Sequence, residues 1–144
     1  MKNIKLISLQ FILAMWLFSC SSGDDTPLPE NSAGVSEAVK SGTWRITYFW
    51  DTDKEETNHY LGYSFTFAQN GDLTATNGSN TYTGSWSTGT DDSQVKLIIN
   101  FSAPEDFVEI SDDWHVVEQS ASKIRLEDVS GGNGGTDLLT FEKN

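Results

Sequence analysis

The feature that most constrains this fold is a two-residue alternation of apolar and polar side chains, which begins near Gly42 and recurs to the end of the chain. In residues 43–50, one face holds Trp44, Ile46, Tyr48 and Trp50, and the other holds Thr43, Arg45 and Thr47. A period of two is that of a β-strand with one buried face. The same pattern predicts eight strands, over residues 43–50, 62–68, 72–76, 81–87, 94–101, 114–118, 123–127 and 136–142.

The segments between these strands are short. Asn-Gly pairs at 70–71 and 77–78 are typical of tight hairpin turns. We expect a polar loop over residues 88–93 and a glycine-rich connection over 131–135. Residues 104–110 begin with proline and two acidic residues and then space apolar residues three apart, which predicts a short helix between the fifth and sixth strands.

An all-β domain over residues 41–144 follows from this pattern. A length of 144 residues leaves little room for a second domain. Eight antiparallel strands with short links suit a closed up-and-down barrel, because closure leaves no exposed sheet edge. A β-sandwich is the alternative.

The first residues predict a signal peptide. Lys2 and Lys5 precede an apolar run over residues 6–18. Its thirteen residues would cover about 20 Å as a helix, which is short of the roughly 30 Å hydrocarbon core of a membrane. The run is therefore typical of an export signal rather than of a spanning helix.

The end of that run, Leu17-Phe18-Ser19-Cys20, resembles a bacterial lipobox. The resemblance implies that residues 1–19 are removed and that Cys20 carries acyl chains that anchor the protein. Residues 20–40 are then a flexible tether, with one helical turn near its end over residues 35–40 and Ser36 as its N-cap. Ser21 in place of aspartate favours the outer membrane, and the acidic start of the tether resembles surface-export signals of Bacteroidetes lipoproteins. Both the periplasmic face and the cell surface are compatible with these signals.

The strand pattern also resembles a known family. Gly42-Thr43-Trp44 at the start of an eight-stranded meander resembles the Gly-x-Trp signature of lipocalins. Residues 42–49, 62–67, 111–114, 131–137 and 141–143 resemble the lipocalin-like lipoproteins of Bacteroidetes and Flavobacteria. The resemblance implies that Trp44 plugs one end of the barrel and that a basic residue, Arg125 or Lys123, packs on its ring.

Aromatic side chains dominate the predicted interior, and two functions are compatible with them. A ligand pocket would bind a small apolar or planar molecule near the barrel mouth. A filled barrel would instead act as an interaction module that docks onto an outer-membrane assembly or a surface glycan. The rings expected inside are Tyr48, Trp50, Tyr63, Phe65, Phe67, Tyr82, Trp86, Phe101 and Trp114, and the ligand contacts expected among them are Tyr48, Trp50, Tyr63, Phe65 and Trp86.

Composition and motifs argue against other classes. Twenty-one acidic and nine basic residues give a net charge of −12, which disfavours nucleic acid as a partner. A single cysteine excludes an internal disulfide. No nucleophile motif or phosphate loop occurs, so we expect neither an enzyme nor a cofactor. His59 and His115 stand apart and are expected to bind no metal. An acidic loop over residues 51–56 either binds calcium weakly or is simply solvated.

Overall fold

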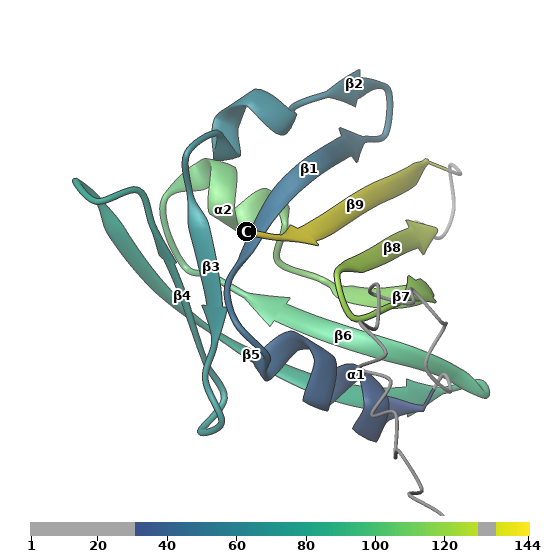
Figure 1. Ribbon diagram of the computed structural model, residues 1–144. Coiled ribbons are helices and arrows are strands. Elements are labelled where there is room, and N and C mark those ends of the chain that lie inside the picture. The colour runs from purple at the N-terminus through teal and green to yellow at the C-terminus, as the bar shows by residue number, and fades with distance from the viewer. Residues whose placement is uncertain (1–30, 130–134) are drawn as a thin grey trace, which may run out of the picture.

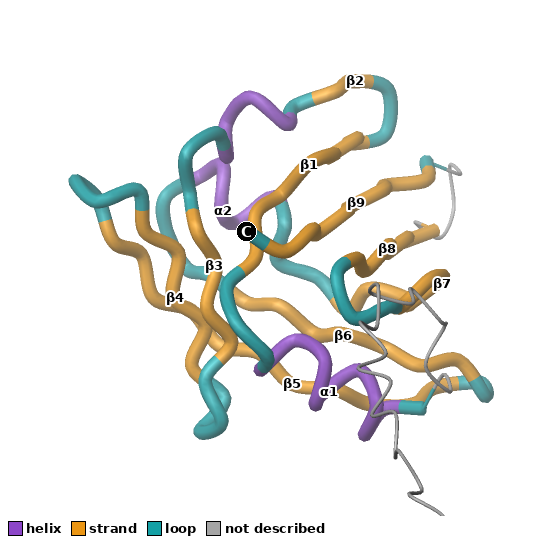
Figure 2. Tube along the Cα trace, viewed as in Figure 1, coloured by secondary structure: helices purple, strands orange, loops and turns teal. Residues whose placement is uncertain are grey.

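The computed structural model describes residues 31–129 and 135–144. Within them lie two α-helices, one 3-10 helix and nine strands (Figure 1). The tube view in Figure 2 shows that strands dominate and that helices lie only at the periphery. In chain order the elements are α1 (Ser32–Lys40), β1 (Trp44–Asp51), β2 (Lys54–Glu55), η1 (Thr57–Tyr60), β3 (Ser64–Phe67), β4 (Asp72–Thr76), β5 (Thr81–Asp91), β6 (Gln94–Asn100), α2 (Glu105–Glu109), β7 (Asp113–Gln119), β8 (Lys123–Val129) and β9 (Thr136–Lys143).

Eight of these strands form a closed antiparallel barrel. Their order is β1-β3-β4-β5-β6-β7-β8-β9, and β9 pairs back onto β1. The short strand β2 lies outside the ring and pairs with the end of β1. Helix α1 precedes the first strand, and α2 lies between β6 and β7, after the fifth strand of the barrel. The predicted up-and-down barrel is therefore confirmed.

Because neighbouring strands run in opposite directions, the barrel has two ends with different coverings (Figure 1). The end that holds α1 and the turns β3–β4, β5–β6 and β7–β8 is here called the α1 end. The end that holds η1, α2 and the turn β4–β5 is called the α2 end. Helix α1 crosses its end and contacts β3, β5 and β6.

The barrel closes unevenly. Strands β1 and β9 share six residue pairs, whereas β1 and β3 share only the pair Trp44–Phe65. Toward the α2 end, β1 and β3 diverge, and η1 and α2 lie beside them (Figure 1). Tyr60 of η1 and Phe107 of α2 are each 1% exposed, with ring centroids 5.6 Å apart. Tyr60 also contacts Phe49 of β1, so these rings fill the space between the diverging strands.

The barrel interior is packed with side chains. The ring of Phe107 has five aromatic neighbours at centroid distances of 4.9–6.0 Å. At the α1 end, Phe67 and Trp86 meet edge to face at 5.6 Å. Such edge-to-face pairs are a favourable arrangement of rings. The buried core residues that form this cluster are Val35, Val39, Trp44, Ile46, Phe49, Tyr60, Phe65, Phe67, Leu73, Ala75, Trp86, Leu97, Ile99, Phe101, Phe107, Ile110, Trp114, Val116, Ile124, Leu126, Leu139 and Phe141.

A β-bulge in β1 corrects part of the predicted interior. The pairing of β1 with β9 shifts by one residue between Ile46 and Tyr48. A bulge reverses the alternation beyond it. Phe49 therefore points into the core at 1% exposure, while Tyr48 is 37% exposed. The prediction that Tyr48 and Trp50 face inward is wrong, because the bulge interrupts the strict alternation on which it rests.

Residues 31–41, directly before the barrel, are more ordered than the tether predicted there. Helix α1 spans nine residues rather than one turn, and its N-cap is Asn31, whose Oδ1 accepts a hydrogen bond from the Gly34 amide at 2.7 Å. Its buried side chains Val35 and Val39 belong to the core. Gly42, at φ +87°, then turns the chain from the helix into β1 in a conformation that favours glycine. The domain therefore includes α1 and does not begin at residue 41.

The expected polar loop over residues 88–93 is also wrong. Strand β5 continues to Asp91, which pairs with Gln94 at the start of β6. Only Asp92 and Ser93 form the turn, with φ values of 46° and 67°. Two residues with positive φ make the hairpin turn whose twist matches the flanking strands. Residues 87–91 are all exposed or half-buried and pair with β6, so polar side chains are compatible with a strand here.

Several predictions concern residues outside the described ranges. These are the signal peptide over 1–19, the lipidation of Cys20, most of the tether and most of the glycine-rich connection. Within residues 31–129 and 135–144, no helix has both the length and the apolar character needed to cross a membrane.

Candidate functional site

Trp44 anchors the α1 end of the barrel. Its side chain is fully buried, and its Nε1 donates a hydrogen bond to the Val39 carbonyl of α1 at 2.8 Å. The Lys143 ammonium lies 5.3 Å from the centre of the Trp44 ring. Lys143 therefore takes the position expected for Arg125 or Lys123, which instead pair with Glu118 at 3.2 Å and 3.3 Å. Both predictions are wrong, because β9 rather than β8 is the neighbour of β1.

The five predicted ligand contacts do not converge on one cavity. Phe65 is fully buried and Trp86 is 8% exposed, so both belong to the packed interior. Tyr63 is partly buried and packs against Phe107 at 5.1 Å. Tyr48 and Trp50 lie on the outer face of β1. None of the five lines any of three surface pockets in the described part of the chain.

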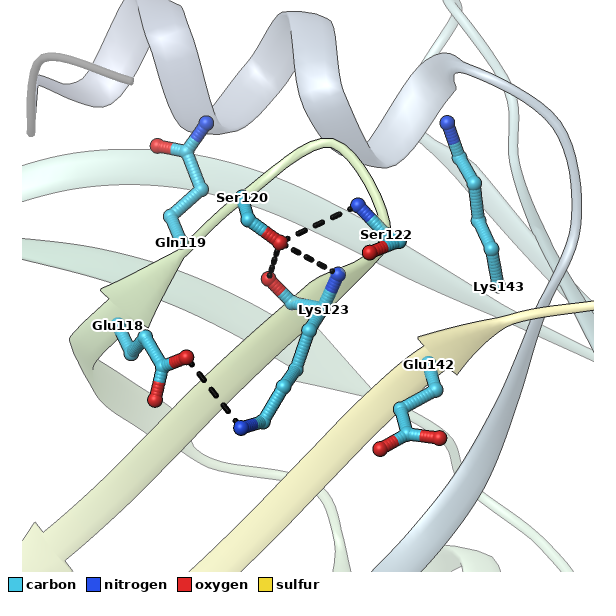
Figure 3. A pocket seen from close by; sticks show the side chains of 7 residues that line it. All are labelled: Glu118, Gln119, Ser120, Ser122, Lys123, Glu142 and Lys143. Atoms are coloured by element: carbon cyan, nitrogen blue, oxygen red, sulfur yellow. Dashed lines mark hydrogen bonds and ion pairs between the residues drawn. The ribbon is translucent and has the colours of Figure 1, made fainter. Parts of the chain in front are cut away.

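The largest of these pockets lies on the rim of the α1 end (Figure 3). It has a volume of about 380 Å³ and is formed where β7 ends, β8 begins and β9 ends. We call it the rim pocket. Figure 3 shows α1 passing above it and the β7–β8 turn at its border. Its lining residues are Glu118, Gln119, Ser120, Ser122, Lys123, Glu142 and Lys143.

The β7–β8 turn holds this rim in place. The buried hydroxyl of Ser120 accepts hydrogen bonds from the amides of Lys123 at 3.0 Å and Ser122 at 3.3 Å. The Ser120 amide donates to the Lys123 carbonyl at 2.8 Å. The Lys143 amide donates to the Ser122 carbonyl at 2.9 Å, which joins the turn to β9. The backbone around the pocket is therefore fixed without any ligand.

Charges of both signs border the rim pocket. The Lys123 ammonium lies 3.3 Å from Glu118, and Figure 3 shows the Glu142 carboxylate on its other side. The hydrogen bond from Arg125, and then that from Lys123, lowers the pKa of Glu118 below its ordinary value. Glu142 pairs with Arg45 at 3.5 Å. Both carboxylates thus lie beside cationic neighbours.

Gln119 adds an unsatisfied polar group at the inner side of this pocket. The residue is 2% exposed, and its Nε2 donates to the Gly34 carbonyl of α1 at 3.2 Å. Its Oε1 is buried and has no hydrogen-bond partner. Buried polar atoms nearly always have a partner, so this oxygen is available to a donor from a ligand or a water molecule. The sequence pattern does not show it, because strict alternation from Trp114 and Val116 places Gln119 on the opposite face, and only the register shift between Val116 and Glu118 turns it inward.

A second pocket, of about 260 Å³, lies beside the β5–β6 turn and includes Ser93, His115 and Glu127. His115 and Glu127 are cross-strand partners. No side-chain hydrogen bond or ion pair joins any two of these three residues in the described part of the chain. A nucleophile activated by a base requires such a bond. The trio therefore lacks the geometry of an activated serine.

The fold and its pockets define a class: a closed eight-stranded barrel with a packed interior and polar pockets on its outside. No protein-family model matches the chain, and no curated protein matches it. A solved structure that does match is that of a DUF4847 family protein from Bacteroides vulgatus, with a TM-score of 0.53 and 19% sequence identity. The match covers 77% of this chain and 98% of that chain. This likeness shows a shared fold.

Proposed function

We propose that this protein is a lipid-anchored, lipocalin-like lipoprotein of the outer membrane, and that its filled barrel binds a saccharide in the rim pocket without catalysing a reaction. The observation that carries this proposal is the packed interior, where Phe107 alone has five aromatic neighbours. An eight-stranded barrel has room for its own side chains or for one small ligand. Because aromatic rings fill the interior, a ligand would bind at the rim of the barrel instead.

The chemistry of the rim pocket favours a saccharide. Sugar hydroxyls both donate and accept hydrogen bonds. The pocket offers acceptors on Glu118 and Glu142, and donors on Lys123 and Lys143. Its volume of about 380 Å³ is near the lower end of the range for small-molecule sites, roughly 300–1,000 Å³. The mixed charge suits a neutral or amino sugar better than a strongly charged one.

The membrane anchor is part of the same proposal. It rests on the resemblance of residues 17–20 to a lipobox and on the position of Cys20 at the end of the apolar run. Cys20→Ala would abolish incorporation of a palmitate analogue and release the protein from the membrane fraction. Persistence of both labelling and membrane association in that variant would refute the anchor.

A second candidate function is the binding of a small apolar ligand on the outside of the barrel. Tyr48 and Trp50 share the outer face of β1 beyond the bulge, and Tyr48 is 37% exposed. Neighbouring rings of this kind can hold a planar apolar molecule. Quenching of tryptophan fluorescence by such a molecule, lost in Trp50→Leu, would favour this candidate over the saccharide.

Calorimetric titration of the mature protein with a panel of neutral and amino-sugar oligosaccharides tests the rim pocket. We expect at least one to bind, and Glu142→Gln and Lys123→Gln each to weaken it about tenfold or more, since hydrogen bonds to charged groups contribute about 1.5–3 kcal/mol. Glu127→Gln, in the second pocket, is the matched control and should leave binding unchanged. Absence of binding across the panel, or equal affinity in all four proteins, would contradict the proposal.

A further inference from the structure

A cluster of possible metal ligands lies at the α2 end, on the opposite side of the barrel from the rim pocket. Glu56 directly precedes η1, and His59 lies within it. Glu109 is the last residue of α2. One ligand atom from each of these three residues lies within 4.8 Å of the other two. The chain between β1 and β3 and the chain between β6 and β7 thus meet at one point.

Backbone hydrogen bonds fix the positions of Glu56 and His59. The Glu56 amide donates to the Phe49 carbonyl of β1 at 3.0 Å, and the Phe49 amide donates to the Thr57 hydroxyl at 2.8 Å. The His59 amide donates to the Glu56 carbonyl at 3.1 Å. Residues 56–59 are therefore held against β1, so two potential ligands need no large backbone movement to reach a shared ion.

Helix α2 is held against the same segment. The Tyr60 hydroxyl donates to the Asp106 carbonyl, and the rings of Tyr60 and Phe107 are in contact at 5.6 Å. This contact brings Glu109 and the Asp106 carboxylate to η1. The Asp106 Oδ1 lies 3.4 Å from His59 Nδ1.

The imidazole of His59 carries the unexplained polar atom of this cluster. Its Nδ1 is buried and has no hydrogen-bond partner. A neutral imidazole nitrogen without a proton has a lone pair that a metal ion can accept. Beside it, Glu56 is only 3% exposed, and only the exposed Lys54 pairs with it. Lys54 is thus the cation paired with Glu56, and Asp106 is the charged contact of His59, while the Nδ1 itself still lacks a hydrogen-bond partner beside the ligand atoms of Glu56 and Glu109.

Charge balance supports the same reading. Glu56, Asp106 and Glu109 bring three carboxylates to this end, against one lysine and one histidine. A divalent cation would offset the repulsion among these carboxylates.

We propose that Glu56, His59 and Glu109 bind one divalent transition-metal ion, with zinc the best match, at the α2 end of the barrel. An imidazole ligand favours zinc over calcium or magnesium, which prefer oxygen alone. Zinc ligands lie about 2.0–2.2 Å from the ion, so side-chain rotations that bring the three atoms slightly closer complete the site. Asp106 or a water molecule takes the fourth position. The bound ion links η1 to α2 and stabilises the fold.

Titration of the mature, chelator-treated protein with zinc chloride tests this site by calorimetry and by thermal unfolding. We expect one zinc ion per chain and a rise in Tm that EDTA reverses. His59→Ala and Glu109→Gln should each raise the Kd by about tenfold or more, the loss typical even of residues that only support metal ligands. Both residues are partly exposed, so these variants keep the core intact.

Matched controls separate this site from incidental binding. His115→Ala removes the other histidine, and Asp112→Asn alters a purely acidic cluster with Asp113 and Asp128. Both variants should bind zinc as the unaltered protein does. The proposal is overturned if zinc neither binds nor changes Tm, if calcium binds equally well, or if His115→Ala rather than His59→Ala abolishes binding.

Discussion

The two ends of this barrel are closed by different means. At the α2 end, short segments insert rings between diverging strands, and Phe107 lies among five aromatic neighbours. At the α1 end, a nine-residue helix crosses the opening and one buried tryptophan bonds to it. The apolar closure leaves little room for a ligand, whereas the helical closure leaves a polar pocket of about 380 Å³ beside it.

Each end also contains a buried polar atom without a partner. At the α1 end it is Gln119 Oε1, and at the α2 end it is His59 Nδ1. The first is an acceptor among groups that suit sugar hydroxyls, and the second faces carboxylates that suit a metal ion. The comparison shows that a barrel with a packed interior still presents chemically distinct polar groups at its two ends.

The largest effect is expected from the aromatic closure. Phe107→Ala should lower the free energy of unfolding by about 3–5 kcal/mol, because it removes a fully surrounded ring and leaves a cavity. Val108→Ala, its neighbour on α2 at 46% exposure, should change stability by less than about 0.5 kcal/mol. Urea unfolding followed by circular dichroism measures both. Equal losses in the two variants would mean that the α2 end does not depend on this ring.

A smaller effect is expected at the helical closure. Trp44→Phe removes the donor to the Val39 carbonyl and should cost about 1–3 kcal/mol. Lys143→Met removes the cation above the Trp44 ring and should cost about 0.5–1 kcal/mol. Arg125→Met, which leaves that ring untouched, should cost less than Lys143→Met. The reverse order in denaturant unfolding would restore Arg125 as the partner of Trp44.

The smallest effects concern pH, and the two ends should differ in sign. The pKa of Glu118 is lowered by Arg125 and Lys123, so its ion pairs stabilise the fold above the ordinary pKa of 4.5 and are lost as pH falls through the lowered value. Burial raises the pKa of Asp112, at the α2 end, above 3.8. Its charge therefore destabilises the fold at neutral pH, and acidification through the raised pKa removes that penalty.

Two isosteric variants measure this difference. Glu118→Gln should lower Tm slightly at pH 7, by less than about 1 kcal/mol in stability for an exposed ion pair, and the loss should vanish in acid. Asp112→Asn should raise Tm slightly at pH 7, and the gain should vanish as pH falls. Parallel pH dependence in the two variants would show that the ends do not differ in this way.

Much of the barrel was predictable because period-two alternation and turn residues are local signals. They predicted the antiparallel strands, and Phe65, Phe67 and Trp114 lie in the core as expected. They failed where a single residue changes register. Strict alternation predicts that Tyr48 and Trp50 point inward, but the bulge after Ile46 turns them outward. That bulge arises from pairing with β9, some ninety residues away in sequence, so no local pattern indicates it.

The candidate sites were less predictable for the same reason. Gln119 and Gly34 are 85 residues apart, and the Lys143 amide bonds the β7–β8 turn. Glu56 reads in sequence as one of several acidic loop residues, yet η1 buries it and α2 brings Glu109 beside it. Neither neighbourhood leaves a spacing signature, because each joins short segments from separate strand connections.

By itself the sequence determined the class of fold, since alternation and hairpin turns are properties of neighbouring residues. It also placed Gly42 and Trp44 at the start of the first barrel strand, where the structure has them. Only the tertiary structure decided which rings fill the barrel, which lysine lies over Trp44, and which polar atoms stay unpaired at its ends. These depend on strand register and on contacts between distant segments, and such contacts form only when the barrel closes.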